Sequence, residues 1–332
     1  MSVPPSHLAE HEWELLDRAK RWHAHSDWLE LSAETLQEIV RQEGIDFATA
    51  LLYSRLCESP EHGPVIQSVE QLATQDNGEK QETGLCVAIV PGGCHEENTD
   101  SRDCLRLVYQ EVQRLGFKAE VVPTTSFGCI VENAQIIRSW LKSRSETPVI
   151  VVSLSKGTAE VKLALRDPDL FQHVAGWVNV SGLFYGSEWV SWLLDRRISR
   201  LGARIWCWHL GYSYATLEQL RRGTGTPLDF DLNLPEQFTL MHVVGFPLAA
   251  SLSHRHTRRS LRRLSERGPN DGMGFMLSDL HRAGGEIYPV WNADHFLRPD
   301  DRDMKDFVGP VLDYVATRAN QTWGMSENSA TK

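Results

Sequence analysis

The sequence predicts an α/β protein built on a mostly parallel β-sheet with helices on both faces. From Leu85 onward, short apolar runs alternate with stretches of helical periodicity. Parallel strands require crossover connections, which helices usually supply, so this alternation favours a parallel sheet. Unbroken Val and Ile runs, such as residues 149–152, are typical of strands that are buried on both faces.

The individual elements follow from the periodicity of the apolar residues. Short continuous or alternating apolar runs predict strands, and apolar residues three or four positions apart predict helices. The expected strands are 85–93, 118–124, 148–153, 174–182, 238–245 and 286–291. The expected helices among and after them are 101–116, 131–143, 156–165, 273–284 and 302–319. Three further expected helices precede the first strand, at 7–24, 32–44 and 46–59.

These elements divide the chain into four expected parts. Residues 1–75 form a helical segment, which the polar stretch 74–84 joins to an α/β domain over residues 85–320. Within that domain, residues 183–237 contain several Trp and Tyr residues, and an excursion of this length is usually a lid or cap. Its aromatic residues either line an apolar substrate pocket or pack the insertion onto the sheet. Residues 321–332 are expected to be a flexible tail.

The charge distribution limits the classes of partner. The 332 residues carry a formal charge of −10, which argues against a general nucleic-acid binder. The Arg-rich stretch 253–267 is a local exception, either a solvent-facing helix surface or a contact for an anionic group such as phosphate. No apolar run reaches the roughly 18 residues of a membrane span, and the N-terminus lacks a signal-peptide pattern. The oligomeric state does not follow from these features.

The cysteines and histidines predict a cytoplasmic protein with no metal site. The six cysteines are scattered and include no C-x-x-C pair, which fits reduced thiols. His23 with His25, and His254 with His256, have no Cys or carboxylate cluster beside them and are interpreted as surface residues. No cofactor is expected, because the dinucleotide-binding pattern G-x-G-x-x-G is missing from the sequence.

The stretch SLSKG, residues 153–157, stands where a buried strand passes into a helix. Open parallel sheets bind ligands at the carboxyl ends of their strands, and Ser155 follows such an end. The stretch matches the nucleophile-elbow pattern G-x-S-x-G at its second glycine, while Ser153 replaces the first and is expected to point into the packing below. Two other interpretations stay open: a Ser-x-x-Lys acyl-enzyme motif of Ser153 and Lys156, and an ordinary strand-to-helix turn.

An elbow serine needs a base that a carboxylate orients, and both occur in the expected order. Asp271 lies in a Pro-Asn-Asp-Gly turn that is expected to open a helix, and His295 follows the last strand in NADHF. After the first strand, the residues VPGGC, which end at Cys94, offer backbone donors for an oxyanion. On these residues the chain resembles the α/β-hydrolase superfamily over roughly residues 85–320.

The resemblance implies a serine hydrolase that acts on an ester or thioester of a small-molecule acyl substrate. Ser155 would be the nucleophile, His295 the general base and Asp271 the acid that orients it. The backbone N–H of Lys156 and that of Gly93 or Cys94 would bind the oxyanion. The Lys156 side chain would be left to meet an anionic substrate or, by preference, to pair with a nearby carboxylate.

The insertion supplies the expected pocket residues, Trp189, Trp192 and Trp206. Together with the N-terminal helices, it is expected to cover the site and to exclude water. Two alternatives to a hydrolase stay open: a non-catalytic binding protein of the same fold, and an acyltransferase that uses the same triad.

Three other aspartates compete with Asp271 for the role of the acid. Asp294 is adjacent to His295, and neighbouring side chains on an extended loop point apart. Asp231 belongs to the insertion and precedes the strand that the acid should follow. Asp279 is expected to face solvent from a helix. Asp271 is therefore preferred.

Overall fold

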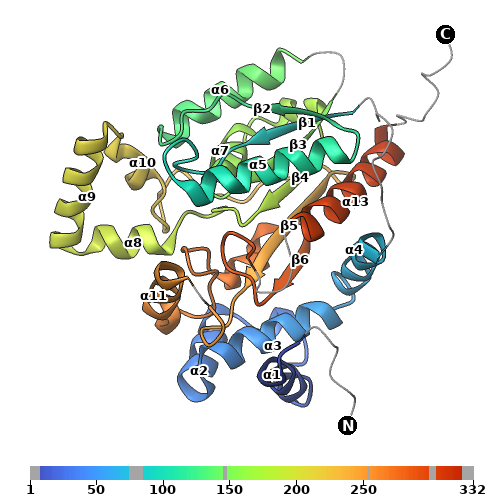
Figure 1. Cartoon of the computed structure of the whole chain (residues 1–332), viewed down its shortest axis with the longest axis vertical. Coiled ribbons are helices and arrows are strands. Elements are labelled where there is room, and N and C mark those ends of the chain that lie inside the picture. Colours follow the sequence, from blue (N-terminus) through green and yellow to red (C-terminus); the bar gives the residue numbers. More distant parts are fainter. Residues whose placement is uncertain (1–7, 75–84, 145–147, 253, 299–303, 324–332) are drawn as a thin grey trace.

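The computed structural model describes residues 8–74, 85–144, 148–252, 254–298 and 304–323. Over these residues the strands form one parallel sheet of six, in the order β2-β1-β3-β4-β5-β6 (Figure 1). They are β1 (Cys86–Val90), β2 (Lys118–Val121), β3 (Val149–Leu154), β4 (Val174–Val180), β5 (Thr239–Phe246) and β6 (Glu286–Trp291). Each overlaps a predicted strand, so the predicted parallel sheet is confirmed.

Helices precede, connect and follow the strands. The α-helices are α1 (Glu10–Lys20), α2 (Ala33–Glu43), α3 (Ile45–Glu58), α4 (Gly63–Thr74), α5 (Thr99–Arg114), α6 (Ile130–Lys142), α7 (Lys156–Ala164), α8 (Glu188–Asp195), α9 (Arg197–Leu210), α10 (Tyr214–Gln219), α11 (Arg255–Leu264), α12 (Leu280–Ala283) and α13 (Lys305–Trp323). Short 3₁₀ helices are η1 (Trp28–Glu30), η2 (Pro168–His173), η3 (Ser265–Arg267) and η4 (Leu277–Asp279). Helix α4 was not predicted, because its Gly-Pro start has the composition of a turn, although proline is well suited to the first helical positions.

The sheet is covered on both faces, as predicted. Along β1, Val87 and Ile89 belong to one buried cluster, and Ala88 and Val90 belong to another on the opposite face. The first cluster includes residues of α4, α5 and α13, and the second includes residues of α3, α6 and α7 (Figure 1). Burial on both faces explains why every residue of β3 is buried and most are apolar.

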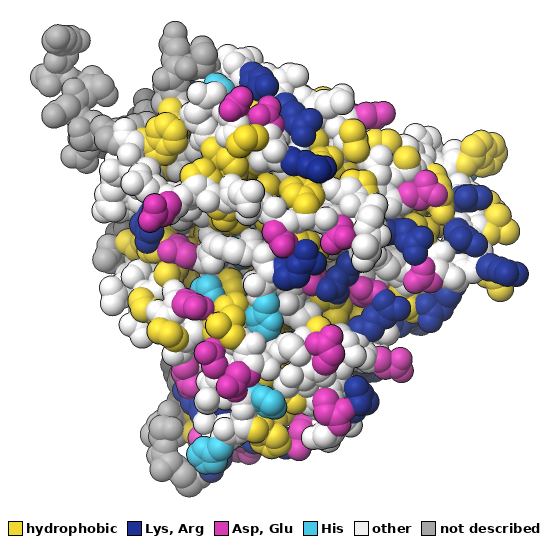
Figure 2. Space-filling view, turned by 180° about the vertical axis from the view of Figure 1, so that it is seen from behind, with side chains coloured by type: hydrophobic (Ala, Val, Ile, Leu, Met, Phe, Trp, Pro, Cys, Tyr) yellow, Lys and Arg dark blue, Asp and Glu magenta, His cyan; other side chains and the backbone are white. Residues whose placement is uncertain are grey.

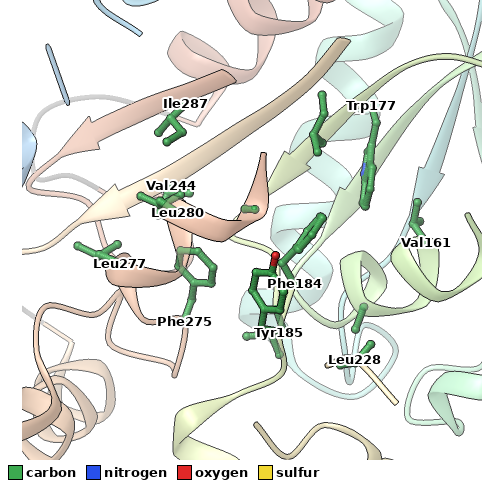
Figure 3. Packing of buried hydrophobic residues seen from close by; sticks show 14 of the residues in the cluster. Val161, Trp177, Phe184, Tyr185, Leu228, Val244, Phe275, Leu277, Leu280 and Ile287 are labelled. Atoms are coloured by element: carbon green, nitrogen blue, oxygen red, sulfur yellow. The ribbon is translucent and has the colours of Figure 1, made fainter. Parts of the chain in front are cut away.

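The base of the insertion is fixed to the sheet by large buried rings. Trp177 of β4 stacks on Phe184, with ring centroids 5.6 Å apart, and Phe184 meets Tyr185 edge-on at 5.3 Å. Figure 3 shows these three rings near Leu228, which belongs to the far end of the insertion. The buried ammonium of Lys162 donates hydrogen bonds to the carbonyls of Phe184, at 2.9 Å, and Leu228, at 2.8 Å. The two ends of the insertion are thereby tied together.

The rest of the insertion, α8 to α10, extends away from the sheet. On α9, Ile198 is 88% exposed and Trp208 is 81% exposed. Figure 2 shows apolar side chains beside Lys and Arg on the protruding end of the molecule at its right edge. Some aromatic residues of the insertion therefore pack inward. Others, such as Trp208, are exposed to solvent, and neither line a pocket nor pack the insertion onto the sheet.

Two carboxylates of the N-terminal helices accept hydrogen bonds from residues at and just after the carboxyl ends of β5 and β6. The carboxylate of Glu12 accepts hydrogen bonds from the side chains of Trp291 and Asn292. The carboxylate of Asp46 accepts hydrogen bonds from the backbone N–H of Ala249, at 2.6 Å, and from that of the following residue, at 3.2 Å. This segment thus supports the two loops that lead to Asp271 and away from Trp291.

Two predicted boundaries are wrong. The helix expected over 273–284 begins only with η4 and α12, because residues 270–276 form a loop instead. Residues 321–323, which were expected to belong to a flexible tail, are part of α13, which continues to Trp323; residues 324–332 and the linker residues 75–84 lie outside the described residues. Among the described helices, none has both the length and the apolar character that a membrane crossing requires.

Candidate active site

Ser155 occupies a sharp turn between β3 and α7. Its backbone has φ 47° and ψ −112°, a conformation that costs a non-glycine residue about 1–3 kcal/mol. Its N–H donates to the carbonyl of Val180 at 3.0 Å, and its own carbonyl accepts from the N–H groups of Thr158 and Leu183, both at 3.1 Å. Contacts with the end of β4 and the start of α7 therefore hold the strained turn in place.

Gly157 is required by the path of the neighbouring strand. A Cβ atom at this position would lie 2.5 Å from the carbonyl oxygen of Pro91 and 2.7 Å from that of Val90. Both atoms are backbone and cannot move aside. The second glycine of the elbow pattern thus permits the close approach of α7 to the end of β1.

Ser153, which replaces the first glycine of the pattern, is fully buried under the turn, as expected. Its hydroxyl accepts a hydrogen bond from the indole N–H of Trp177 at 2.8 Å and contacts the hydroxyl of Thr158 at 2.8 Å. Ser153 therefore has structural partners on the side away from Ser155.

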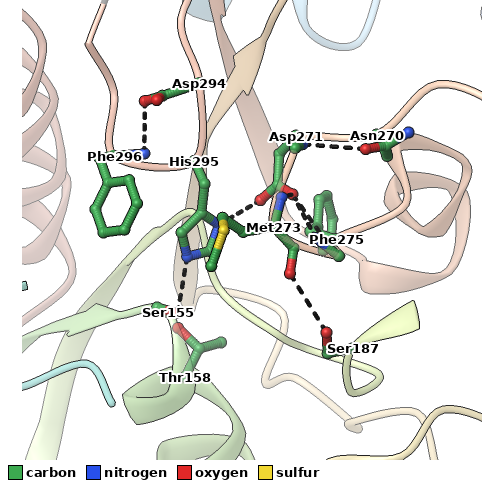
Figure 4. A network of polar contacts seen from close by, with 12 residues as sticks. Ser155, Thr158, Ser187, Asn270, Asp271, Met273, Phe275, Asp294, His295 and Phe296 are labelled. Carbon is green, nitrogen blue, oxygen red and sulfur yellow. Dashed lines mark hydrogen bonds and ion pairs between the residues drawn. The ribbon is translucent and has the colours of Figure 1, made fainter. Parts of the chain in front are cut away.

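The imidazole of His295 links Ser155 to Asp271 (Figure 4). Nε2 of His295 lies 2.9 Å from Oγ of Ser155, and Nδ1 lies 2.5 Å from Oδ2 of Asp271. His295 is almost fully buried and Asp271 is completely buried. The structure thus brings together the three residues that the sequence proposed, in the order of contacts that a nucleophile, a base and an orienting carboxylate require.

The carboxylate of Asp271 is held by the loop that follows it. Its Oδ1 accepts hydrogen bonds from the backbone N–H groups of Met273, at 2.9 Å, and of Gly274 and Phe275, both at 3.0 Å. Gly272 and Gly274 have φ values of 85° and 114°, which let successive N–H groups turn toward one oxygen. The positive φ values of Gly272 and Gly274 are incompatible with a helix, and a β-bridge between Asn270 and Met276 closes the loop, so residues 273–276 form no helix. The three N–H groups also stabilise a buried negative charge.

Two of the competing aspartates have other partners. Asp294 points away from the imidazole: Oδ1 accepts from the N–H of Phe296 at 2.9 Å, and Oδ2 accepts from the guanidinium of Arg298 at 2.7 Å. Asp231 accepts from the hydroxyl of Tyr185 at 2.8 Å. These contacts agree with the reasons for preferring Asp271.

The expectation for Asp279 is wrong. Its side chain is buried rather than solvent-facing, and it is paired with the guanidinium of Arg222. Burial raises the pKa of Asp279 to about 6, against the opposing influence of the arginine. The position differs from the prediction because Asp279 lies at the junction of η4 and α12 and not on an exposed helix face.

The loop after β1 lies against the start of α7. A Cβ atom on Gly93 would lie only 3.3 Å from Cδ of Lys156. The N–H of Cys94 donates to the carbonyl of Ser126 at 3.2 Å, whereas the N–H of Gly93 makes no hydrogen bond within the described part of the chain. Of the two oxyanion donors that the sequence offered here, Gly93 is therefore the one that stays open to a ligand. The N–H of Lys156 begins α7 and has no acceptor within that helix.

The side chain of Lys156 is buried and forms an ion pair with the buried carboxylate of Glu160, as the sequence favoured. The side-chain amide of Asn133 donates to the same carboxylate at 2.7 Å. Burial raises the pKa of Glu160, while Lys156 and Asn133 act in the opposite direction. Since the ammonium pairs with Glu160 and not with Ser153, these contacts oppose a Ser-x-x-Lys motif.

A cavity of about 900 Å³ opens beside Ser155 and His295. Its apolar walls come mainly from the insertion. The apolar residues that line it include Phe127, Leu154, Val180, Leu183, Trp189, Val190, Leu193, Ala203, Trp206, Leu217, Leu220, Met273 and Phe296. None of the lining residues belongs to the described N-terminal helices, so the expectation that these helices help to cover the site is wrong. Helix α3 packs against β5 and β6 and α4 packs against β6, while α1 and α2 pack against α3.

The three predicted pocket tryptophans divide into two groups. Trp189 and Trp206 line the cavity. Trp192 does not; its ring lies between two guanidinium groups, that of Arg196 at 4.1 Å and that of Arg263 at 4.9 Å. The expectation that Trp192 lines the pocket is therefore wrong, and its ring makes cation–π contacts with Arg196 and with Arg263 of α11 instead.

The sequence left the role of α11 open between a solvent-facing helix surface and a contact for an anionic group. His256, Arg259, Ser260 and Arg263 line the cavity, although the stretch 253–267 could equally be a solvent-facing helix. The last three are three, four and seven positions away from His256, so all four share one face of a helix. This spacing was the signal that could have identified them as a common surface. His254 is exposed, and the described residues hold no group of three or more His, Cys, Asp or Glu residues suited to a metal ion.

No family model and no curated protein matches this sequence. Solved structures are similar to it at low identity. A metagenomic carboxyl esterase is 19% identical, with 72% of this chain and 76% of that chain covered, at a TM-score of 0.53. A lipase of Bacillus licheniformis in its mature form is 16% identical, with 73% of this chain and 91% of that chain covered, at a TM-score of 0.47. The likeness to the first of these and the parallel sheet covered on both faces lead to one conclusion: the chain has the α/β-hydrolase fold.

Proposed function

We propose that this protein is a serine hydrolase that cleaves a carboxylic ester or thioester through an acyl-enzyme intermediate. The observation that carries the proposal is the position of His295, whose two ring nitrogens contact Oγ of Ser155 and the carboxylate of Asp271 at 2.9 Å and 2.5 Å. The strained turn at Ser155 and the adjacent cavity support the same chemistry. The metagenomic protein of the same fold is named as a carboxyl esterase, which is consistent with this proposal.

In the first half of the reaction, Oγ of Ser155 attacks the acyl carbon while Nε2 of His295 takes the hydroxyl proton. Asp271 accepts the Nδ1 proton in a hydrogen bond, so it keeps the imidazole in the required tautomer and stabilises the imidazolium. His295 then gives its proton to the departing alcohol or thiol. The acyl group remains on Ser155.

The negative charge of the tetrahedral intermediate needs preorganised donors. The N–H of Lys156 and that of Gly93 are the proposed pair, because the N–H of Cys94 already donates to Ser126. Losing one such donor typically raises the barrier by about 3–4 kcal/mol. The side chain of Lys156 takes no part, since it is paired with Glu160.

In the second half, a water molecule attacks the acyl carbon and passes a proton to His295, which returns it to Oγ of Ser155. The acid is released and the enzyme is restored. The largely apolar walls of the cavity suit the hydrocarbon part of an acyl group.

A fluorophosphonate probe tests the proposal directly. We expect the purified protein to be labelled at Ser155 and to release p-nitrophenol from p-nitrophenyl esters, and we expect both activities to be lost in Ser155→Ala. The matched control is Ser153→Ala, which keeps Ser155. Labelling that maps to Ser153, or that persists in Ser155→Ala, contradicts the assignment. A folded protein that neither reacts with the probe nor cleaves any ester would be a binding protein.

A further inference from the structure

The cavity lining contains basic side chains and no acidic ones. Besides His295, the lining includes Lys156, His256, Arg259 and Arg263, and it includes no Asp or Glu. Lys156 is neutralised by Glu160. The guanidinium groups of Arg259 and Arg263 therefore carry the positive charge that a molecule in the cavity would meet.

These two arginines have no carboxylate partner within the described part of the chain. Arg222 pairs with Asp279 and Arg267 pairs with Glu188, whereas the other described arginines of α11 are likewise without such a partner. Arg259 and Arg263 differ from those because they line the cavity. Helix α11 itself, Arg255–Leu264, contains no acidic residue. Both side chains are exposed, so water solvates them in the free protein. A molecule in the cavity would meet their charge with no competing carboxylate in the lining, which suits an anionic group.

The placement of the pair follows from the helix. His256, Arg259 and Arg263 are three and four residues apart, so they share the face of α11 that lines the cavity. Helix α11 contacts α8, and the guanidinium of Arg263 lies 4.9 Å from the ring centre of Trp192 on that helix (Figure 1). This stacking restricts Arg263 and lowers the entropy that it loses when it binds a ligand.

We infer that the substrate carries an anionic group, a carboxylate or a phosphate, which Arg259 and Arg263 bind while its ester or thioester carbonyl lies at Ser155. This inference rests on the proposed function and names the substrate class. A guanidinium donates two parallel hydrogen bonds to a carboxylate or phosphate, which fixes the orientation of the substrate in addition to its affinity. His256 lies on the same helix face and adds a further polar contact at the cavity wall.

The experiment compares esters that differ only in one charge. For an anion in the acyl part, p-nitrophenyl hydrogen glutarate is compared with p-nitrophenyl glutaramate, its neutral amide. For an anion in the leaving group, 4-butanoyloxybenzoate is compared with 4-butanoyloxybenzamide. We expect the anionic member of at least one pair to have a kcat/KM roughly tenfold to a hundredfold higher than its neutral partner, the range of a charge-assisted contact. The pair that shows the difference identifies the side of the ester on which the anion lies.

The variants locate this preference. Arg259→Gln, which leaves the stacking of Arg263 on Trp192 intact, and Arg259→Gln with Arg263→Gln should both reduce the ratio of anionic to neutral kcat/KM, the double variant toward one. The control is Arg255→Gln with Arg262→Gln, which removes two exposed arginines of the same helix that do not line the cavity. It should leave the ratio as in the wild type. A wild-type ratio near one for both pairs overturns the inference, and so does an equal loss in the control.

Binding separates this inference from the proposed chemistry. In Ser155→Ala, titration calorimetry with p-nitrophenyl hydrogen glutarate and with 4-butanoyloxybenzoate should show that one of them binds, with an affinity that falls at least tenfold on Arg259→Gln. This result would support the anion site even if the wild type reacted with no ester or probe. If the wild type hydrolyses neutral esters but neither anion binds through Arg259, the proposed function stands and the anion site is wrong.

Discussion

The indole N–H of Trp177 donates a hydrogen bond of 2.8 Å to the hydroxyl of Ser153, two residues before the proposed nucleophile. The hydroxyl of Ser153 lies 2.8 Å from that of Thr158, which donates in turn to Oδ1 of Asn179 at 2.6 Å. Because the proton of Thr158 is used on Asn179, Ser153 must donate to Thr158. The residue that replaces the first glycine of the elbow pattern is therefore a link in a buried hydrogen-bond chain that runs from Trp177 to Asn179.

The first prediction concerns Ser153. Ser153→Gly leaves the buried indole N–H of Trp177 without this acceptor, so the free energy of unfolding should fall by about 1–3 kcal/mol. Probe labelling of Ser155 should continue, since a glycine fits the turn. Ser153→Leu should instead overpack the site and displace the turn, with loss of labelling. Urea denaturation and probe labelling measure the two effects. A fully labelled leucine variant would show that the turn tolerates displacement.

The second prediction concerns the acid. In Asp271→Asn, the side-chain oxygen can still accept the three backbone N–H groups, but the amide nitrogen then faces Nδ1 of His295. The imidazole is held in the wrong tautomer, and kcat should fall by up to about 10⁴-fold while the protein stays folded. The matched control is Asp294→Asn, which affects the contact with Arg298 and should change stability more than kcat. Steady-state kinetics with p-nitrophenyl butyrate tests both, and the reverse ranking of the two variants would assign the acid to Asp294.

The third prediction concerns Gly202 on α9. This residue lines the cavity, and a Cβ atom on it would meet no heavy atom within 4 Å. Gly202→Ala should stabilise the protein by about 0.5–1 kcal/mol through the helix propensity of alanine. Gly202→Leu should reduce the cavity volume, so kcat/KM should fall for decanoyl esters more than for acetyl esters. The alanine variant serves as the control for chain length. An unchanged chain-length profile in the leucine variant would mean that α9 does not bound the acyl site.

The fourth prediction concerns His242, which continues the chain that begins at Trp177. Nδ1 of His242 accepts from the amide of Asn179 at 2.7 Å, and Nε2 then donates to the carbonyl of Gly284 at 2.9 Å. The contact with Asn179 requires the neutral imidazole, because a protonated Nδ1 cannot accept, whereas Nε2 can donate to Gly284 in either state. Burial lowers the pKa of His242 from its usual 6.5 to about 4.

Between these two pKa values the unfolded chain binds more protons at His242 than the folded chain does, so stability falls as the pH falls. The stabilisation is complete above pH 6.5 and is lost as the pH approaches 4, by up to about 3 kcal/mol. Urea denaturation at pH 7, 5.5 and 4.5 should therefore show that the stability advantage of the wild type over His242→Gln becomes smaller as the pH falls. The comparison removes the contribution of other groups, such as Asp279. A constant difference would contradict a neutral buried His242.

The sequence by itself determined the sheet, its parallel direction and the positions of Ser155 and His295 at the ends of strands. These features follow from local patterns: continuous apolar runs predict the strands, and the residues after Leu154 and Trp291 are placed at the carboxyl edge of any parallel sheet. Because these patterns are local, they could not predict the loop at residues 270–276, where a helix was expected. The glycines of residues 270–276 permit a loop, but nothing near them in the sequence shows that their N–H groups converge on Asp271.

The tertiary structure alone decided which groups meet. Ser155 and His295 are 140 residues apart, and their 2.9 Å contact depends on the packing of β3, β6 and the loop at Asp271. Packing also engaged the N–H of Cys94 with Ser126, buried Asp279, and placed Arg259 and Arg263 in the cavity lining. The periodicity of a sequence encodes which side of an element is apolar. The partner of each polar group is set only when distant elements come together, because a hydrogen bond requires its two atoms to lie within about 3.2 Å.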